Sequence, residues 1–358
     1  MCKSELHSFL QQLPKCEHHL HLEGALTPQL LFSLAAKNHI QLPKDDPAYA
    51  SPEALVERYR KFDSLDDFLG YYYIGMSVLL HAEDFEALAW DYFEHAASDG
   101  VLHAEVFFDP PQQAHTSRGV SYDVVHSGFQ RARQRAQAEL GISSELILCF
   151  LRHLPPANAV SIFEQDAVLA SFTAGGVVGI GLDSSEKPFP PELFQAVYSK
   201  AEAMGLKLTA HAGEEGPAEY IRSALDTLKV ARIDHGVRLI QDPALLERVA
   251  AEKIMLTICP MSNVFLKGVS SVAELPLREF IDAGVRFSIN SDDPAYFGNH
   301  YILSNYCAVQ EAFHLTTDEW IQICDGSIRG SWCSEGRKEE LLARLRLVNS
   351  DWRNKHHA

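Results

Sequence analysis

Three histidines stand within four positions near the start of the chain, in the stretch LPKCEHHLHLEG at residues 13 to 24. Imidazole nitrogens are common metal ligands in proteins, so this cluster raises the question of a metal site. If Pro14 to Leu22 forms a β-strand, its side chains alternate, and His19 and His21 leave one face while His18 leaves the other. Two imidazoles on one face could hold one metal ion. The motif alone also allows a polar strand end whose histidines face solvent.

Histidines and carboxylates also follow three later apolar runs. The stretch TAHAGEE contains His211 and Glu214, IDHG contains His235, and INSDDP contains Asp292 and Asp293. A single histidine at a strand end is usually a structural, hydrogen-bonded residue. The joint occurrence of such residues at four predicted strand ends is harder to explain by packing.

Two histidines from one strand, a third from another and a carboxylate from a fourth would form a nitrogen and oxygen site that suits zinc and leaves a position for water. We therefore predict that His19, His21, His211 and Asp292 hold one Zn²⁺ per chain. Zinc at such a site lowers the pKa of water towards neutrality and so supplies hydroxide.

Three further residues are predicted to act on protons and substrate. Glu214 lies close after His211, and a carboxyl in a closed pocket can carry the raised pKa that a general acid needs; a helix-capping role near Pro217 is the alternative. His235 would orient or deprotonate the water and stabilise developing charge, or would make only a supporting hydrogen bond. Asp293 would hold its proton tightly and bind a ring nitrogen of a heteroaromatic substrate. The alternative is that SDDP forms an ordinary turn.

Eight short apolar runs, each followed by a segment of helical period, are predicted to position these residues. The predicted strands are Leu13–His19, Val101–Phe108, Glu145–Leu151, Val177–Leu182, Leu206–Ala210, Ala231–Asp234, Ile254–Ile258 and Val285–Ile289. The predicted helices between them include Tyr122–Leu140, Pro191–Met204, Tyr220–Leu228, Pro243–Glu252 and Val272–Ala283. Eight such units favour an α/β fold, a (β/α)₈ TIM-type barrel, in which catalytic groups lie at the C-terminal ends of the strands.

The barrel is predicted to form a single domain over residues 1–358 with helical additions. An insertion at about 26–100 separates the first two strands, with helices expected at Leu30–Asn38, Leu65–Leu80 and Asp84–Ser98. Further helices at about 315–347 are expected to pack on the barrel, and the tail SDWRNKHHA is expected to fray.

Composition restricts the partners. The formal charge of −17 argues against nucleic acid and anionic membranes as partners, but not against a neutral small substrate. The sequence shows no signal peptide and no apolar run of about 18 residues, so we expect a cytoplasmic protein, with the nucleus as a further location, that is not secreted. Its seven cysteines are scattered without any C-x-x-C, which argues against a disulfide framework or a cysteine-based zinc site. A homo-oligomer is compatible with the barrel class, and the oligomeric state stays open.

The motifs HLHLEG, AHAGE, DHG and SINSDDPAYFG, in this order and spacing, resemble those of the adenosine/adenine deaminase family, and the resemblance covers essentially the whole chain. The stretches EHHLHLEG, ILCFLRHLP, GLDSSE, CPMSN and SDDPAYFG resemble more narrowly its fungal-type adenine deaminase branch. The resemblance implies attack of zinc-activated water at C6 of a purine, protonation at ring N1 and loss of ammonia. Carried over by position, it implies the same four zinc ligands, Glu214 as proton donor, His235 near the attacking water and Asp293 as a substrate contact.

Two positions bear on the choice between base and nucleoside. Where nucleoside deaminases of the family resemble HLDG, this chain has the longer Glu23, and in GLDSSE it has Glu186 in place of a glycine. These carboxylates could fill the space of a sugar or bind the N9 edge of a free base, with Ser185 as a neighbouring substrate contact. Capping of the next helix by Glu23 and solvent exposure of Glu186 are the alternatives.

The expected activity is therefore the hydrolytic deamination of adenine, a purine base, to hypoxanthine and ammonia in purine salvage. Deamination of adenosine is the alternative within the same class, and N6-methyl-AMP is disfavoured because the site motifs lack a basic cluster for a phosphate. A catalytically silent purine-binding protein is the alternative from another class. The H-x-E and P-C-x-x-C pattern of the other zinc deaminases is absent.

Overall fold

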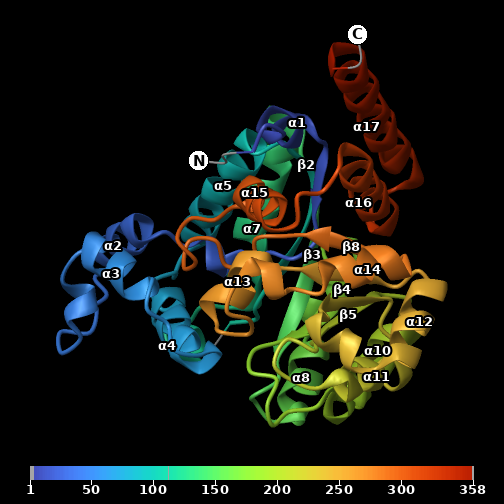
Figure 1. The fold of residues 1–358 in the computed structure, drawn as a ribbon. Helices are drawn as coiled ribbons and strands as arrows, with labels where there is room; N and C mark the ends of the chain where they lie inside the picture. The colour runs from blue at the N-terminus through green and yellow to red at the C-terminus, as the bar shows by residue number, and fades with distance from the viewer. Residues whose placement is uncertain (1–3, 112, 357–358) are drawn as a thin grey trace.

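A computed structural model describes residues 4–111 and 113–356, and its centre is a sheet of eight parallel strands in sequential order (Figure 1). The strands are β1 (Lys15–Glu17), β2 (Val101–Phe108), β3 (Ser143–Leu151), β4 (Gly179–Asp183), β5 (Lys207–Ala212), β6 (Arg232–His235), β7 (Met255–Ile258) and β8 (Arg286–Ile289). Each of the eight predicted strands overlaps one of these. Beyond β1 and β8, a bridge between Leu20 and Asp292 joins the first and last strands. The predicted α/β fold, a (β/α)₈ barrel, is confirmed.

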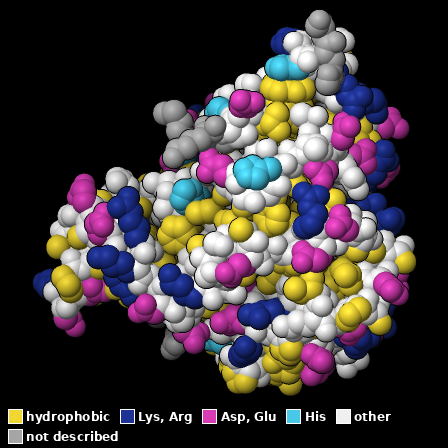
Figure 2. All heavy atoms as spheres, viewed as in Figure 1, with side chains coloured by type: hydrophobic (Ala, Val, Ile, Leu, Met, Phe, Trp, Pro, Cys, Tyr) yellow, Lys and Arg dark blue, Asp and Glu magenta, His cyan; other side chains and the backbone are white. Residues whose placement is uncertain are grey.

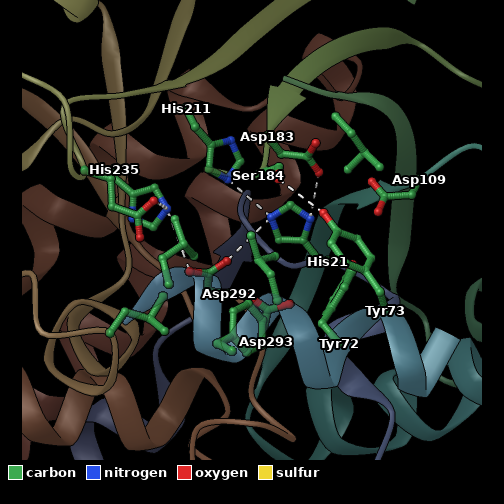
Figure 3. A pocket seen from close by; sticks show the side chains of 16 residues that line it. His21, Tyr72, Tyr73, Asp109, Asp183, Ser184, His211, His235, Asp292 and Asp293 are labelled. Atoms are coloured by element: carbon green, nitrogen blue, oxygen red, sulfur yellow. Dashed lines mark hydrogen bonds and ion pairs between the residues drawn. The ribbon is translucent and has the colours of Figure 1, made fainter. Parts of the chain in front are cut away.

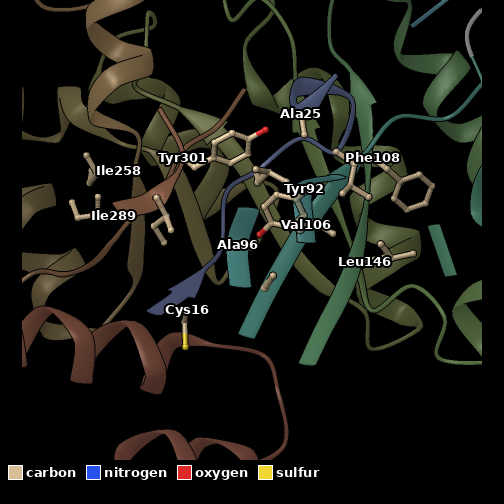
Figure 4. Packing of buried hydrophobic residues seen from close by; sticks show 14 of the residues in the cluster. Cys16, Ala25, Tyr92, Ala96, Val106, Phe108, Leu146, Ile258, Ile289 and Tyr301 are labelled. Carbon is tan, nitrogen blue, oxygen red and sulfur yellow. The ribbon is translucent and has the colours of Figure 1, made fainter. Parts of the chain in front are cut away.

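The sequences of β2, β3, β4 and β7 are mostly apolar because both faces of each strand are covered, whereas β1 (KCE) and β6 (RIDH) carry buried polar side chains. All residues of β4, β6 and β7 are buried. Parallel strands packed on both faces read as Val-, Ile- and Leu-rich stretches. Figure 4 shows side chains of this core, among them Val106 of β2, Leu146 of β3 and Ile258 of β7.

The helices that follow the strands cover the outside of the barrel. They are α6 (Gln113–Thr116), α7 (Tyr122–Glu139), α8 (Pro156–Phe163), α9 (Asp166–Thr173), α10 (Gln195–Ala203), α11 (Ala218–Asp226), α12 (Pro243–Ala251), α13 (Pro260–Phe265) and α14 (Leu277–Ala283), with 3₁₀ turns η3 (Pro191–Phe194), η4 (Val237–Gln241) and η5 (Val272–Glu274). The predicted helices are confirmed to within a few residues. Two of them, Pro191–Met204 and Val272–Ala283, each divide into a 3₁₀ turn and an α-helix.

The segment between β1 and β2 is helical, as predicted, and part of it projects beside the barrel (Figure 1). It contains η1 (Glu23–Ala25), α2 (Pro28–Lys37), η2 (Pro47–Ala50), α3 (Pro52–Tyr59), α4 (Leu65–Met76) and α5 (Ala82–Ser98), and α1 (His7–Gln12) precedes β1. Helix α3 was not predicted. It begins with Pro52 after Ser51, whose hydroxyl accepts a hydrogen bond from the Ala54 amide, a local start signal.

Three helices close the chain: α15 (Ile302–Phe313), α16 (Thr317–Gly330) and α17 (Glu335–His356). The prediction that the tail is frayed from Ser350 onwards is wrong for residues 350–356, because α17 continues to His356. Trp352 packs its ring against Phe9 of α1, with centroids 5.0 Å apart, and this contact stabilises the last turns. The final two predicted tail positions lie outside the described residues.

On the face shown in Figure 2, basic and acidic side chains are intermixed, and neither forms a large patch of one charge. Within the ranges that the structure describes, no helix combines the length and apolar character that crossing a membrane requires.

Candidate active site

Four side chains converge where β1, β5 and β8 end, and they are the four predicted metal ligands. Figure 3 shows three of them, His21, His211 and Asp292. One ligand atom each from His19, His21, His211 and Asp292 lies within 4.8 Å of all the others. Asp292 Oδ1 is 3.1 Å from His19 Nε2 and 3.6 Å from His21 Nε2, and the Nε2 atoms of His21 and His211 are 3.3 Å apart. The structure therefore brings together residues from opposite ends of the chain.

The outer ring nitrogens of the three histidines face polar groups that fix the rings. His19 Nδ1 lies 2.8 Å from Thr257 Oγ1, and His211 Nδ1 lies 3.7 Å from Asp234 Oδ2. His21 Nδ1 lies 3.5 Å from a carboxyl oxygen of Asp183. Such outer partners orient imidazoles so that the opposite nitrogens meet at one point, which is the usual arrangement around a bound metal ion.

The electrostatics of the four-residue cluster favour a cation. Burial acts to raise the pKa of Asp292, but the facing histidines outweigh it and hold that pKa well below its usual value. Burial likewise acts to lower the pKa of His19, yet the Asp292 charge raises it. His19 Nε2 is buried and faces Asp292 Oδ1 at 3.1 Å. Three imidazoles and one carboxylate around this point fit Zn²⁺ as a donor set.

A second set of potential ligands shares His19 and Asp292 and adds His235 and Cys259. Burial, with Asp292 next in size, raises the pKa of the Cys259 thiol well above its usual value. Because a cysteine binds metals as thiolate, this set is the poorer candidate. The sequence reading did not single out Cys259, although it directly follows β7.

Glu214 and His235 face each other beside the cluster. Glu214 Oε2 is 3.6 Å from His235 Nε2, which is 3.7 Å from Asp292 Oδ2. Burial and the Asp292 charge raise the pKa of Glu214 well above its usual value, which favours the protonated carboxyl. Burial lowers the pKa of His235 to about 3, so its ring is neutral. The capping alternative for Glu214 does not hold, because α11 begins at Ala218 with no side-chain cap.

Asp293 is buried against Gly24 and faces the same cavity. A Cβ atom at Gly24 would lie 2.0 Å from Asp293 Oδ1, so the glycine after Glu23 is required by this close approach. Burial and neighbouring Asp292 raise the pKa of Asp293 well above its usual value. The turn alternative holds as well, because the Asp293 carbonyl accepts a hydrogen bond from the Tyr296 amide at 3.0 Å.

Glu186 lies away from the cavity wall. Its side chain is fully buried, which excludes the solvent-exposed alternative. Its carboxylate accepts hydrogen bonds from the backbone amides of Glu214, Glu215 and Gly216, of which the first is 3.2 Å long. The structure therefore places Glu186 as the support of the loop that carries Glu214.

Ser185 and Glu23, the other two residues predicted to select the substrate, also form hydrogen bonds within the protein. The Ser185 hydroxyl donates a 2.5 Å hydrogen bond to Asp66 of α4, and Ser184 lines the cavity in its place. Glu23 begins η1, and its Oε1 accepts a 3.0 Å hydrogen bond from the Asp109 amide. Neither Ser185 nor Glu23 is among the residues that line the cavity.

A small cavity with a volume of about 40 Å³ lies above the cluster. Side chains of α4 form an apolar roof over it: Leu65, Phe68, Leu69, Tyr72 and Tyr73. Sequence reasoning missed two wall residues, Asp109 at the end of β2 and Asp183 at the end of β4. The available signal was the same one that revealed the ligands, a carboxylate directly after an apolar run.

Strained backbone occurs at three of these strand ends, and six further non-glycine residues with positive φ lie elsewhere among the described residues. Ser184, His235 and Asp292 have φ angles of 72°, 61° and 65°, in the left-handed region that side chains other than glycine rarely adopt. Such conformations cluster at functional sites, where the surrounding structure holds them in place.

Comparison with known proteins agrees with this fold and site. The family model described as adenosine deaminase matches residues 14–348, and the chain belongs to that family. It is 58% identical over 343 residues to the adenine deaminase of Schizosaccharomyces pombe, covering 96% of this chain and 93% of that protein.

Two solved structures are similar over nearly their whole length. The adenine deaminase from Arthrobacter aurescens is 41% identical, with a TM-score of 0.87 over 95% of this chain and 99% of that one. An amidohydrolase from Burkholderia ambifaria with bound Zn is 26% identical, with a TM-score of 0.84 over 98% of this chain and 97% of that one.

Proposed function

We propose that this chain is a zinc-dependent hydrolase that converts adenine and water to hypoxanthine and ammonia, and that it acts in purine salvage as one domain over residues 1–358. The observation that carries the proposal is the buried convergence of His19, His21, His211 and Asp292 beside the buried carboxyl of Glu214. The identity of 58% to an adenine deaminase over nearly the whole chain supports adenine as the substrate.

The four proposed ligands, His19, His21, His211 and Asp292, would hold one Zn²⁺ ion. When bound, this ion lowers the pKa of water and makes a nucleophile available near neutral pH. The neutral ring of His235 faces Asp292 and orients the attacking water through a hydrogen bond.

Glu214 supplies the proton in this mechanism. Its carboxyl, protonated in the buried site, donates to ring N1 of adenine as C6 is attacked, so negative charge does not build up on the ring. Asp293, protonated for the same reason, donates a hydrogen bond to a second ring nitrogen. As the C6 carbonyl forms from the water oxygen, one proton of that water restores the Glu214 carboxyl and the other joins the amino group, which leaves C6 as ammonia.

The apolar side chains of α4 reduce the access of water to one side of the cavity. Phe68 and Tyr72 are buried there, with exposed fractions of 3% and 4%. A dry site strengthens the interactions of Glu214 and Asp293 with the purine and preserves the raised pKa of both carboxyls.

The test is a comparison of substrates with the purified protein. Ammonia release is followed with adenine, adenosine, AMP and N6-methyl-AMP, and zinc is measured by elemental analysis. We expect adenine to be deaminated fastest and one zinc per chain. A preference for adenosine would replace the proposed substrate, and absence of zinc with full activity would refute the metal site.

A further inference from the structure

Asp109 is a buried acid that the mechanism above does not use. It follows β2 directly, only 2% of its surface is exposed, and it lines the cavity. Neither of its side-chain oxygens accepts a hydrogen bond from an N–H or hydroxyl group in the described ranges. A buried polar group without such a partner costs about 1–3 kcal/mol, which a ligand could recover.

The surroundings fix the main chain of Asp109 and give its carboxyl one hydrogen-bonding partner, the side chain of Asp183. Its backbone amide donates to Glu23 Oε1, so the main chain is fixed. Burial, followed by the charge of Asp183, raises the pKa of Asp109 well above its usual value. The two acids share one hydrogen bond, and the Asp109 oxygens and Asp183 Oδ1 have no donor from other residues in the described ranges.

The position of Asp109 is opposite the reacting groups. In Figure 3 the Asp109 carboxyl enters the cavity from one side, with His235 on the other and His21, His211 and Asp292 between. Deamination requires C6 of the purine to face the four-residue cluster. The edge formed by N3 and N9 lies across the ring from C6, so it points away from the cluster towards the Asp109 side.

We propose that Asp109 is a specificity-determining residue that binds the N3–N9 edge of a free purine base and thereby selects the base over the nucleoside. This inference rests on the proposed deamination of adenine. The two atoms of the edge are an acceptor, N3, and a donor, N9–H, and both are bonded to C4. A neutral carboxyl offers the complementary pair, a hydroxyl donor and a carbonyl acceptor, on one carbon.

The same contact excludes a nucleoside by two means. A sugar replaces the hydrogen on N9, so the carbonyl oxygen of Asp109 loses its donor. The sugar would also have to occupy the space beside the buried acids Asp109 and Asp183, which line the cavity. Glu186 is not needed for this selection, since its carboxylate is engaged by the backbone amides of residues 214–216.

The experiment uses the zinc-loaded enzyme and four variants. Asp109→Ala and Asp109→Leu remove the polar pair, and Leu also keeps the branched shape of the side chain. Asp109→Asn keeps one donor and one acceptor. Asp123→Ala is the matched control, because Asp123 is an exposed residue of α7. The measurements are kcat and KM for adenine, Ki for 9-methyladenine, which lacks N9–H, and the melting temperature.

We expect KM for adenine to rise at least ~10-fold in the Ala and Leu variants, while Ki for 9-methyladenine stays level or falls. Asn should retain most of the wild-type preference, and the control should match wild type. The melting temperature should not fall in the Leu variant, because a buried acid without a hydrogen-bond donor is removed.

If the ratio of KM for adenine to Ki for 9-methyladenine is unchanged in both the Ala and Leu variants, the inference is overturned. A lowered melting temperature with an unchanged ratio would assign Asp109 a structural role instead. Both outcomes leave wild-type adenine deamination intact. Failure of the proposed function is recognised separately, because the wild-type enzyme would then release no ammonia from adenine.

Discussion

His19 Nε2 lies 3.1 Å from Asp292 Oδ1 at the seam where the barrel closes. The backbones meet at the same place, since the Asp292 amide donates to the His19 carbonyl and the His21 amide donates to the Asp292 carbonyl, both at 3.1 Å. The first and last strands therefore contribute to one cluster. A metal ion bound by both residues would hold the seam together, so metal binding and barrel stability should be linked.

Removal of the metal should lower the melting temperature. A ligand that binds only the folded state, at a concentration one thousand times its dissociation constant, adds about 4 kcal/mol of stability. Dialysis against a chelator should shift the melting temperature down by several degrees, and added Zn²⁺ should restore it. An unchanged melting temperature, with zinc loss verified by elemental analysis, would contradict the proposed link.

His18 and His19 should differ in their effect on metal content. The His18 ring turns away from the cluster, and its Nε2 lies 2.7 Å from Ser331 Oγ at the end of α16. We expect His18→Ala to retain one zinc per chain and His19→Ala to lose it, as measured on the purified variants by elemental analysis. The opposite result, zinc lost in the His18 variant and kept in the His19 variant, would refute the ligand assignment.

The strands could be predicted from their apolar runs. The convergence of the ligand motifs could be predicted because each motif follows such a run, and the C-terminal ends of parallel strands meet at one end of the barrel. The partners of Glu186 could not be predicted, because they are backbone amides at 214–216 that only the folded loop presents. The same holds for the last turns of α17, which depend on the packing of Trp352 against Phe9. Local sequence carries no record of such contacts.

Glu214→Gln should abolish most turnover without loss of fold or metal. The amide preserves the shape of the side chain but cannot donate the proton of a carboxyl. General acid catalysis contributes typically ~10²–10⁴-fold, so kcat for adenine should fall by about that factor. Zinc content and melting temperature serve as controls in the same preparation. Activity close to wild type would exclude Glu214 as the proton donor.

Glu186→Ala should impair activity on every purine substrate. The substitution leaves the amides of Glu214, Glu215 and Gly216 without their acceptor, and each unsatisfied buried group costs about 1–3 kcal/mol. We expect kcat/KM to fall for adenine with no gain for adenosine, whereas Glu186→Gln, which keeps one acceptor oxygen, should be less impaired. A rise in the ratio of adenosine to adenine activity would instead support the earlier expectation that Glu186 fills the space of a sugar.

Acid should destabilise the protein partly through His18. Burial lowers the pKa of its ring from the usual 6.5 to about 3 in the folded state. As the pH falls below 6.5, the unfolded chain therefore binds a proton at this residue while the folded chain does not, and stability is lost between pH 6.5 and 3. The slope from one such group approaches about 1.4 kcal/mol per pH unit. His18→Gln can still reach Ser331 but does not titrate, so its free energy of unfolding should fall less steeply than that of wild type when both are measured by urea denaturation from pH 7 to 5. Metal ligands and carboxylates titrate equally in both proteins, so the difference between the two curves isolates His18. Parallel curves would show that the His18 ring is not held neutral by the fold.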